Sequence, residues 1–178
     1  MEDGRSVEIA AIGAEGLLGL FAAHGFDHAL LDHIAQMPLL ALRIPRRALQ
    51  NAISKHETLH GAVTRYLVLA AELLAQVSAC NRLHPLEQRC CQWLLVARDN
   101  ALSDQIQITQ EFLASLLGAQ RPSVSTATSR LRKRGLIRYA HGRISILNRA
   151  ALEEAACECY RSRCNLINQA FGASKTSV

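Results

Sequence analysis

The chain of 178 residues is long enough for one domain or two small ones. Apolar residues make up 49% of it and charged residues 20%, a composition typical of folded proteins and not of disordered ones. The formal net charge of +5 favours polyanionic partners. The most apolar stretch, residues 9–26, is interrupted by Glu15 and His24, so we expect no membrane-spanning helix. The acidic Glu2 and Asp3 argue against a secretory signal.

Cysteine usage indicates a reducing environment. The six cysteines form no CxxC pair, and the chain is longer than the small secreted scaffolds that depend on disulfide bonds. We therefore expect reduced thiols and a cytoplasmic location. The cysteines are Cys80, Cys90, Cys91, Cys157, Cys159 and Cys164.

The first 55 residues carry the weaker structural signals. Residues 6–12 alternate well enough for a β-strand, and residues 38–45 predict a second strand. Residues 46–54 then show the apolar spacing of a helix, with Pro45 suited to its first turn. Because two strands alone are marginally stable, we expect this segment to need a partner surface, from the rest of the chain or from a second subunit.

A long helix is predicted from Glu57 to about His84, since this stretch contains no proline and Pro85 follows it. Its apolar residues recur at alternating steps of four and three, which is typical of a coiled-coil seam. Leu67 and Leu74 form a second apolar row. We predict a parallel dimer helix, and the alternative is an internal core helix of a monomer. The seam residues are Leu59, Val63, Tyr66, Ala70, Leu73, Val77, Cys80 and His84.

A helix-turn-helix is predicted after a helix over 87–98 and a loop over 99–104. Thr109 is a good N-cap for the first short helix, which Gly118 ends. The second helix covers residues 121–134 and has a proline in its first turn. The strands predicted next, 136–139 and 143–147, flank a turn and form a hairpin, or wing, before Asn148 caps a final helix. That last helix is expected to carry Leu152, Ala155, Ala156 and Cys159.

Basic residues are concentrated around these elements. No acidic residue lies between Glu111 and Glu153, whereas eight lysines and arginines do. Such a one-signed patch suits the neutralisation of nucleic-acid phosphates. One face of the helix over 121–134 carries small hydroxyl side chains that allow close approach to a groove, and Arg121 at its start is long enough to reach base edges.

Four segments of the helix-turn-helix and wing region together match the sequence pattern of a known family. They are Ile108 to Gly118, Arg121 to Val124, Gly135 to Ile137 and His141 to Ile144. Together they resemble the winged-helix domain of Crp/Fnr-type bacterial transcription regulators. The resemblance implies an α+β, mostly α fold and a homodimer that binds double-stranded DNA and contacts RNA polymerase. The implied domains are a truncated cyclic-nucleotide-binding-like β-roll over 1–55, a dimerisation helix over 56–84 and a winged helix-turn-helix over 85–178.

The resemblance also carries over to single residues. Arg121 matches the base-reading arginine of the family, whereas Pro122 stands where a glutamate is common and Thr126 where another arginine is common. We expect the operator to differ accordingly. The expected base-reading residues are Arg121, Ser123, Ser125, Thr126 and Ser129. The expected phosphate-binding residues are Thr109, Gln110, Arg130, Lys133, Arg138, His141 and Arg143.

Cyclic-nucleotide binding is not expected. The Glu15-Gly16 pair is reversed relative to the family's phosphate-binding pair, and no arginine lies between Arg5 and Arg43 to form a charged fork. No catalytic motif appears, so we expect neither an enzyme nor a cofactor.

We also expect no metal site. Cys80 and His84 are four residues apart, a workable ligand spacing, but both fall in the predicted seam. Cys157 and Cys164 are seven residues apart and would share a helix face, but Cys159 would point the other way, so three thiolates would not converge. The sequence thus predicts a homodimeric regulator that reads a palindromic operator. The alternatives are an interaction module that does not bind DNA, and a thiol- or metal-responsive sensor.

Overall fold

The computed structural model describes residues 6–172 except residues 27 and 30. The chain forms two compact units. Unit 1 consists of Met1–Ala11 and Glu72–Val178, and unit 2 consists of Ile12–Ala71. Helix α3 (Glu57–Leu83) leads from unit 2 into unit 1 along the chain. The mostly helical α+β fold class is confirmed.

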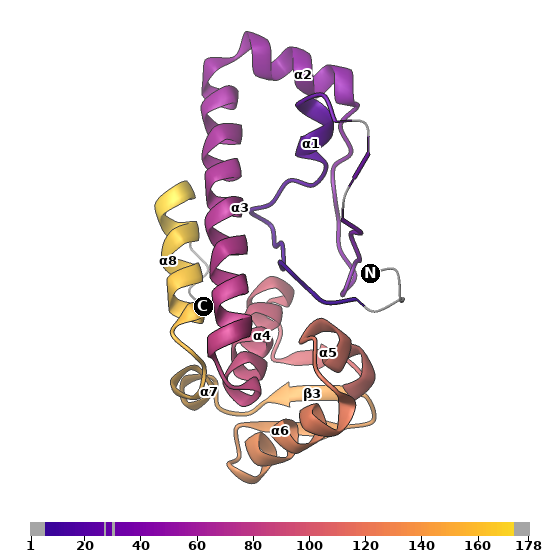
Figure 1. Ribbon diagram of the computed structural model, residues 1–178, viewed down its shortest axis with the longest axis vertical. Helices are drawn as coiled ribbons and strands as arrows, with labels where there is room; N and C mark the ends of the chain where they lie inside the picture. The colour runs from indigo at the N-terminus through magenta and orange to yellow at the C-terminus, as the bar shows by residue number, and fades with distance from the viewer. Residues whose placement is uncertain (1–5, 27, 30, 173–178) are drawn as a thin grey trace. The chain divides into compact units, whose positions relative to one another are not determined.

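Unit 1 contains five further helices and a three-stranded sheet. The strands are antiparallel in the order β1-β3-β2, and their register places Ile144 of β3 opposite Ile106 and Tyr139. Helix α4 packs against α6, α7 and α8, and α5 packs against α6 (Figure 1). The elements are α4 (Leu86–Ala101), β1 (Gln105–Gln107), α5 (Gln110–Leu116), α6 (Arg121–Lys133), β2 (Ile137–Ala140), β3 (Arg143–Ile146), α7 (Arg149–Ala155) and α8 (Cys159–Phe171).

The core of unit 1 lies between α4 and the elements that surround it. The side chains of Leu94, Leu131, Ile144 and Leu152 are fully buried, with exposed fractions of 0%. Since these residues come from α4, α6, β3 and α7, one apolar core fixes the helix-turn-helix, the sheet and the closing helix together.

Unit 2 contains α1 (Leu20–Ala23), α2 (Arg46–Lys55) and the first part of α3. Helix α1 packs against α2, where the Gln50 side-chain amide donates to the backbone oxygen of Ala23 at 3.1 Å.

The prediction of two strands in the first 55 residues is wrong. Residues 6–12 and 38–45 have no regular secondary structure. The backbone N–H of Glu8 instead donates to the oxygen of Leu116 at 3.1 Å, and Trp93 Nε1 donates to the Glu8 carboxylate at 3.2 Å. The alternating pattern predicts a surface that is buried on one side, but a strand also needs a neighbouring strand to pair with.

Other boundaries also differ from the prediction. Helix α4 continues through Ala101, three residues beyond the predicted end, and β1 occupies residues to which the sequence assigned no element. The expected single final helix is two helices, because the chain is extended at Ala156 (ψ 160°) before α8 starts at Cys159. The helices predicted over 46–54, 57–84 and 121–134 are confirmed to within a residue or so at each end.

Helix α3 contains a long apolar stretch that the sequence-based expectation about membrane-spanning helices did not include. By length and composition alone it is long and apolar enough to cross a membrane, with a mean hydropathy of 1.3 over 18 residues; the sequence expectation, which rested on residues 9–26, overlooked this stretch. Only 17% of that stretch is buried within the chain. The same composition is typical of a helix whose faces are covered by other protein helices.

Candidate nucleic-acid interface

The two helices of the helix-turn-helix are set by local signals. Thr109 caps α5, since its Oγ1 accepts a hydrogen bond from the backbone N–H of Phe112 at 3.1 Å. Gly118 follows α5 with a φ of +59°, a conformation that glycine adopts without strain. Pro122 lies in the first turn of α6, and Gly135 follows its end with a φ of +71°.

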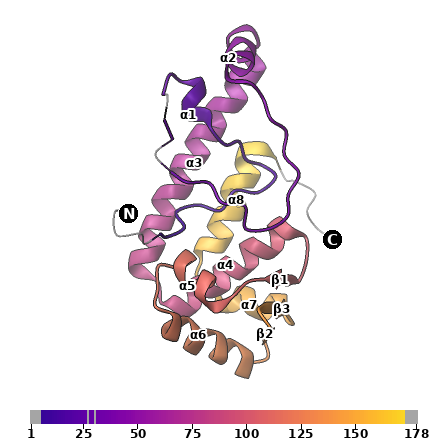
Figure 2. The ribbon, with the colours of Figure 1, turned by 90° about the vertical axis from the view of Figure 1, so that its right-hand side faces the viewer.

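Helix α6 has one buried and one exposed face. Val124, Ala127 and Leu131 are buried, and so is Thr128, whose hydroxyl donates to the Val124 oxygen at 2.9 Å. Burial of this face in the core leaves the opposite face toward solvent, and α6 lies at the outer edge of unit 1 in the view of Figure 2.

The structure places the expected base-reading residues unequally. Arg121, Ser123 and Thr126 are exposed, whereas Ser125 and Ser129 are half-buried. Three of the five expected residues are therefore freely accessible. A serine needs to be accessible to contact a base, because its side chain is short.

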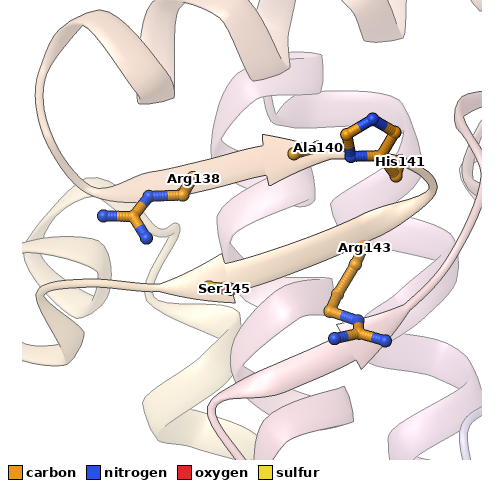
Figure 3. Close-up of a pocket in the computed structure, with 5 residues that line it drawn as sticks. All are labelled: Arg138, Ala140, His141, Arg143 and Ser145. Atoms are coloured by element: carbon orange, nitrogen blue, oxygen red, sulfur yellow. The ribbon is translucent and has the colours of Figure 1, made fainter.

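The wing presents a polar face beside a buried one. The register pairs Arg138 with Ser145 and Ala140 with Arg143, and directly opposite residues project to the same side of a sheet. These four residues and His141 line a shallow hollow of about 290 Å³ (Figure 3). Figure 3 shows Arg138 and Arg143 extending from different strands, with His141 at the turn.

The turn of the wing contains His141 and Gly142, which have φ values of +50° and +72°. Positive φ at both central residues of a two-residue hairpin loop defines a type I′ turn, which matches the twist of the strands. The wing tip is therefore tight, and it holds His141 exposed at the end of the hairpin.

Beside Arg143 and Ser145, strand β1 adds two residues that the sequence analysis missed. Gln105 pairs with Ser145 and Gln107 with Arg143, so both glutamines lie on the same face as the wing residues, and both are exposed. The alternation of glutamine and isoleucine over 105–108 was the available signal, but the strand is only three residues long.

The positive charge of this region is less uniform in space than along the chain. The Glu87 carboxylate of α4 forms ion pairs with two arginines. Its oxygens lie 3.5 Å from a guanidinium nitrogen of Arg130 in α6 and 3.1 Å from one of Arg134, the C-cap residue of α6. Glu111 lies 3.8 Å from Arg121. The acid-free interval of the sequence thus did not predict an acid-free surface, because a neighbouring helix supplies a carboxylate.

Arg149 lies near Asp99 and Glu153, but four other basic residues of the region keep their charge available. Among the described residues, Arg132, Lys133, Arg138 and Arg143 are exposed and have no acidic partner. The Arg121–Glu111 pair joins two largely exposed side chains, 66% and 78% accessible, and such pairs contribute little. A phosphate or a base can therefore replace Glu111 at Arg121.

The expected phosphate-binding residues are all accessible. Gln110 is partly exposed, and the other six are exposed. Thr109 also has a structural role, since its hydroxyl caps α5. The six exposed residues are Thr109, Arg130, Lys133, Arg138, His141 and Arg143.

The expected dimer seam is partly covered in the single chain. Val63 is buried with 5% exposure, and the other expected seam residues between Leu59 and Val77 are half-buried. The most exposed apolar side chains in the middle of α3 are instead Val68 at 60%, Leu67 at 40% and Leu74 at 37%. The second apolar row that contains Leu67 and Leu74 is therefore the more accessible one.

Comparison with protein families assigns this region. Residues 88–155 match the model of the Crp-like helix-turn-helix domain. That range includes α4, β1, the helix-turn-helix, the wing and α7. The expected resemblance to Crp/Fnr regulators is confirmed over these residues. None of the curated proteins matches the sequence significantly.

Solved structures of similar fold include three transcription regulators. A transcriptional regulator of the CRP family from Thermus thermophilus is 31% identical with a TM-score of 0.50, and the match covers 57% of this chain and 55% of the regulator. FixK2 from Bradyrhizobium japonicum is 16% identical with a TM-score of 0.58, covering 64% and 60% of the two chains.

A protein from Eubacterium rectale described as a transcriptional regulator of the Crp/Fnr family is 19% identical, with a TM-score of 0.52 and coverages of 63% and 52%. The chain thus spans between 52% and 60% of the length of these three relatives.

Proposed function

We propose that this chain, whose residues 88–155 form a Crp-like helix-turn-helix domain, is a sequence-specific DNA-binding transcription regulator that acts as a homodimer. The observation that carries the proposal is the joint exposure of one face of α6 and of the basic wing within a single compact unit. A groove-binding helix flanked by phosphate-binding side chains is the arrangement with which winged helices bind duplex DNA.

In this proposal α6 enters the major groove. Arg121 presents its guanidinium to the two acceptors of a guanine, and the short side chains of Ser123 and Thr126 allow the helix to come close to the bases. Ser125 and Ser129 contribute at the edge of the contact, since they are half-buried. Arg138, His141 and Arg143 bind the phosphate backbone from the wing, while Thr109, Gln110, Arg130 and Lys133 bind it beside the helix-turn-helix.

Dimerisation through α3 completes the proposal. Helix α3 contains an 18-residue apolar stretch of which only 17% is buried within the chain. Such a stretch needs another apolar surface to cover it, and α3 of a second copy provides an apolar surface. A two-fold dimer places its recognition helices about 34–36 Å apart, so the operator is a palindrome.

The remaining partners are proposed from the likeness to the Crp type. We place RNA polymerase among the partners and the protein in the cytoplasm, where its six thiols, all free in the structure, remain reduced. We do not propose cyclic-nucleotide binding, because the charged fork that a cyclic phosphate needs is missing from the sequence.

Selection of random duplexes with the purified chain tests the function. We expect enrichment of a palindrome whose half-sites contain a guanine read by Arg121. Arg121→Ala is expected to lower affinity for the selected site by about 1–3 kcal/mol while leaving random duplexes nearly unaffected. Arg143→Ala is the matched control, and it should weaken binding to every duplex alike. Equal behaviour of the two variants would contradict the assigned roles.

A salt titration separates this proposal from an interaction module. Each phosphate contact contributes about 0.9 to the slope of log affinity against log salt concentration, so Arg143→Ala should lower the slope by about that amount. If no duplex is enriched and no salt-dependent DNA binding is measured, the chain uses its winged helix for protein contacts instead.

A further inference from the structure

Unit 1 contains a second cluster of chemically reactive side chains, away from the wing and α6. Cys80, His84, Cys157 and Cys159 each offer one ligand atom, and these four atoms all lie within 4.8 Å of one another. The cysteines are buried with exposed fractions of 3%, 4% and 6%, and His84 is partly buried. The expectation that the thiols do not converge was therefore wrong.

Two local structures bring the ligands together. The backbone N–H of His84 donates to the oxygen of Cys80 at 3.0 Å, so the helical turn continues past α3 and places both side chains on one face. On the other side, the break between α7 and α8 turns the chain so that Cys157 and Cys159 both point to Cys80. A continuous helix would have separated them.

The distances fit one tetrahedral metal ion. Two sulfurs bound to the same Zn²⁺ at about 2.3 Å lie about 3.8 Å apart. The Sγ atoms of Cys80 and Cys157 are 3.6 Å apart, and Cys159 Sγ is 3.6 Å from His84 Nδ1. In a four-iron cluster each thiolate binds a different iron, which requires ligand atoms farther apart than the 4.8 Å limit seen here.

The surroundings of the ligands also fit a metal ion. His84 Nε2 lies 3.1 Å from the Glu158 carboxylate, which fixes Nε2 as the protonated nitrogen and leaves the lone pair of Nδ1 directed at the cysteines. The Gln92 side-chain oxygen Oε1 accepts hydrogen bonds from the Cys80 thiol at 3.2 Å and from the Cys157 thiol at 3.3 Å. Once both thiols are deprotonated, a 180° turn of the Gln92 amide group would let its nitrogen donate to the thiolates instead.

We propose that Cys80, His84, Cys157 and Cys159 bind a single Zn²⁺ ion as a structural Cys₃His site. Three thiols give their protons to solvent on binding, and the thiolates and Nδ1 fill all four positions of the tetrahedron, which leaves none for a substrate. The ion links the end of α3 to the segment between α7 and α8, 73 or more residues away along the chain.

Metal content of the whole chain tests the proposal. Protein that has been stripped of metal, reduced and then dialysed against Zn²⁺ should retain one equivalent. Cys159→Ser should weaken Zn²⁺ binding by more than about 100-fold, since even outer-shell partners of a metal ligand contribute 10- to 100-fold. Cys164→Ser, a half-buried thiol of the same helix outside the cluster, is the control and should retain the full equivalent. Equal loss in both variants would overturn the site.

Two measurements need no cysteine variant. X-ray absorption of the zinc-loaded chain should show three sulfurs at about 2.3 Å and one nitrogen at about 2.0 Å, and a shell of oxygens and nitrogens alone would overturn the proposal. Replacement of Zn²⁺ by Co²⁺ should give the intense visible absorption of a tetrahedral thiolate site. His84→Cys keeps four ligands and should strengthen the thiolate charge-transfer band, whereas an unchanged spectrum would exclude His84 as a ligand.

Discussion

Unit 1 and unit 2 differ in how completely they bury their apolar residues. In unit 1, leucines and isoleucines from six elements reach exposed fractions of 0–1%. These are Leu94, Leu95, Leu113, Leu131, Ile137, Ile144 and Leu152. In unit 2 the buried apolar side chains among the described residues are Leu20, Val63 and Leu69, whereas Leu40 and Leu42 are 103% and 95% exposed.

The difference shows which unit is stable by itself. Unit 1 carries its own core and therefore presents α6 and the wing on a rigid support. Unit 2 leaves much of its apolar surface exposed in the single chain, so we expect its stability to depend on a surface from another molecule. An exposed apolar surface of this kind marks an interaction site.

The largest expected effect concerns the core of unit 1. Leu131→Ala removes a fully buried side chain from α6 and should lower the free energy of unfolding of unit 1 by about 2–5 kcal/mol. Leu42→Ala, at a fully exposed leucine of unit 2, should change it by less than about 0.5 kcal/mol. Thermal and denaturant unfolding measure both, and similar effects of the two substitutions would show that unit 2 contributes to the same core.

A somewhat smaller effect is expected at the accessible apolar row of α3. The double substitution Leu67→Glu with Leu74→Glu places unpaired carboxylates in the proposed dimer interface, which costs several kcal/mol. The dimer should dissociate at least about 100-fold more readily, since 1.4 kcal/mol corresponds to a factor of ten. Sedimentation equilibrium measures the change.

The control for this dimer experiment is Leu102→Glu, a 75% exposed leucine at the C-cap of α4 in unit 1. It should leave the association constant unchanged. If the unmodified chain is a monomer at micromolar concentration, or if the double variant associates as well as the parent, α3 is a core helix and the dimer proposal fails.

Sequence reasoning succeeded where the signal is local. Thr109, Gly118 and Gly135 each act through hydrogen bonds or backbone conformations within a few residues, so the ends of α5 and α6 could be located from residue types alone. The wing followed in the same way from two short strands around His141-Gly142. Burial of Val124 and Leu131 followed from helical periodicity.

It failed where the outcome depends on residues distant in sequence. Residues 6–12 alternate like a strand, but no strand among the described residues pairs with them. Glu87 neutralises arginines that lie more than forty residues later in the chain. Cys157 and Cys159 converge only because the chain breaks between α7 and α8, and that break has neither a proline nor a glycine to announce it.

The smallest expected effect is at the wing tip, where local preference and function can be separated. His141 has a φ of +50° in a type I′ turn, a position that asparagine occupies with less strain. His141→Asn should therefore stabilise unit 1 by about 0.5 kcal/mol, while DNA affinity falls by a few fold for all duplexes because a hydrogen bond to phosphate is lost. His33→Asn, an exposed histidine of unit 2, should change neither quantity. If His141→Asn binds DNA as tightly as the parent, His141 does not contact phosphate. The turn type would be unaffected by that result, because only the stability measurement tests it.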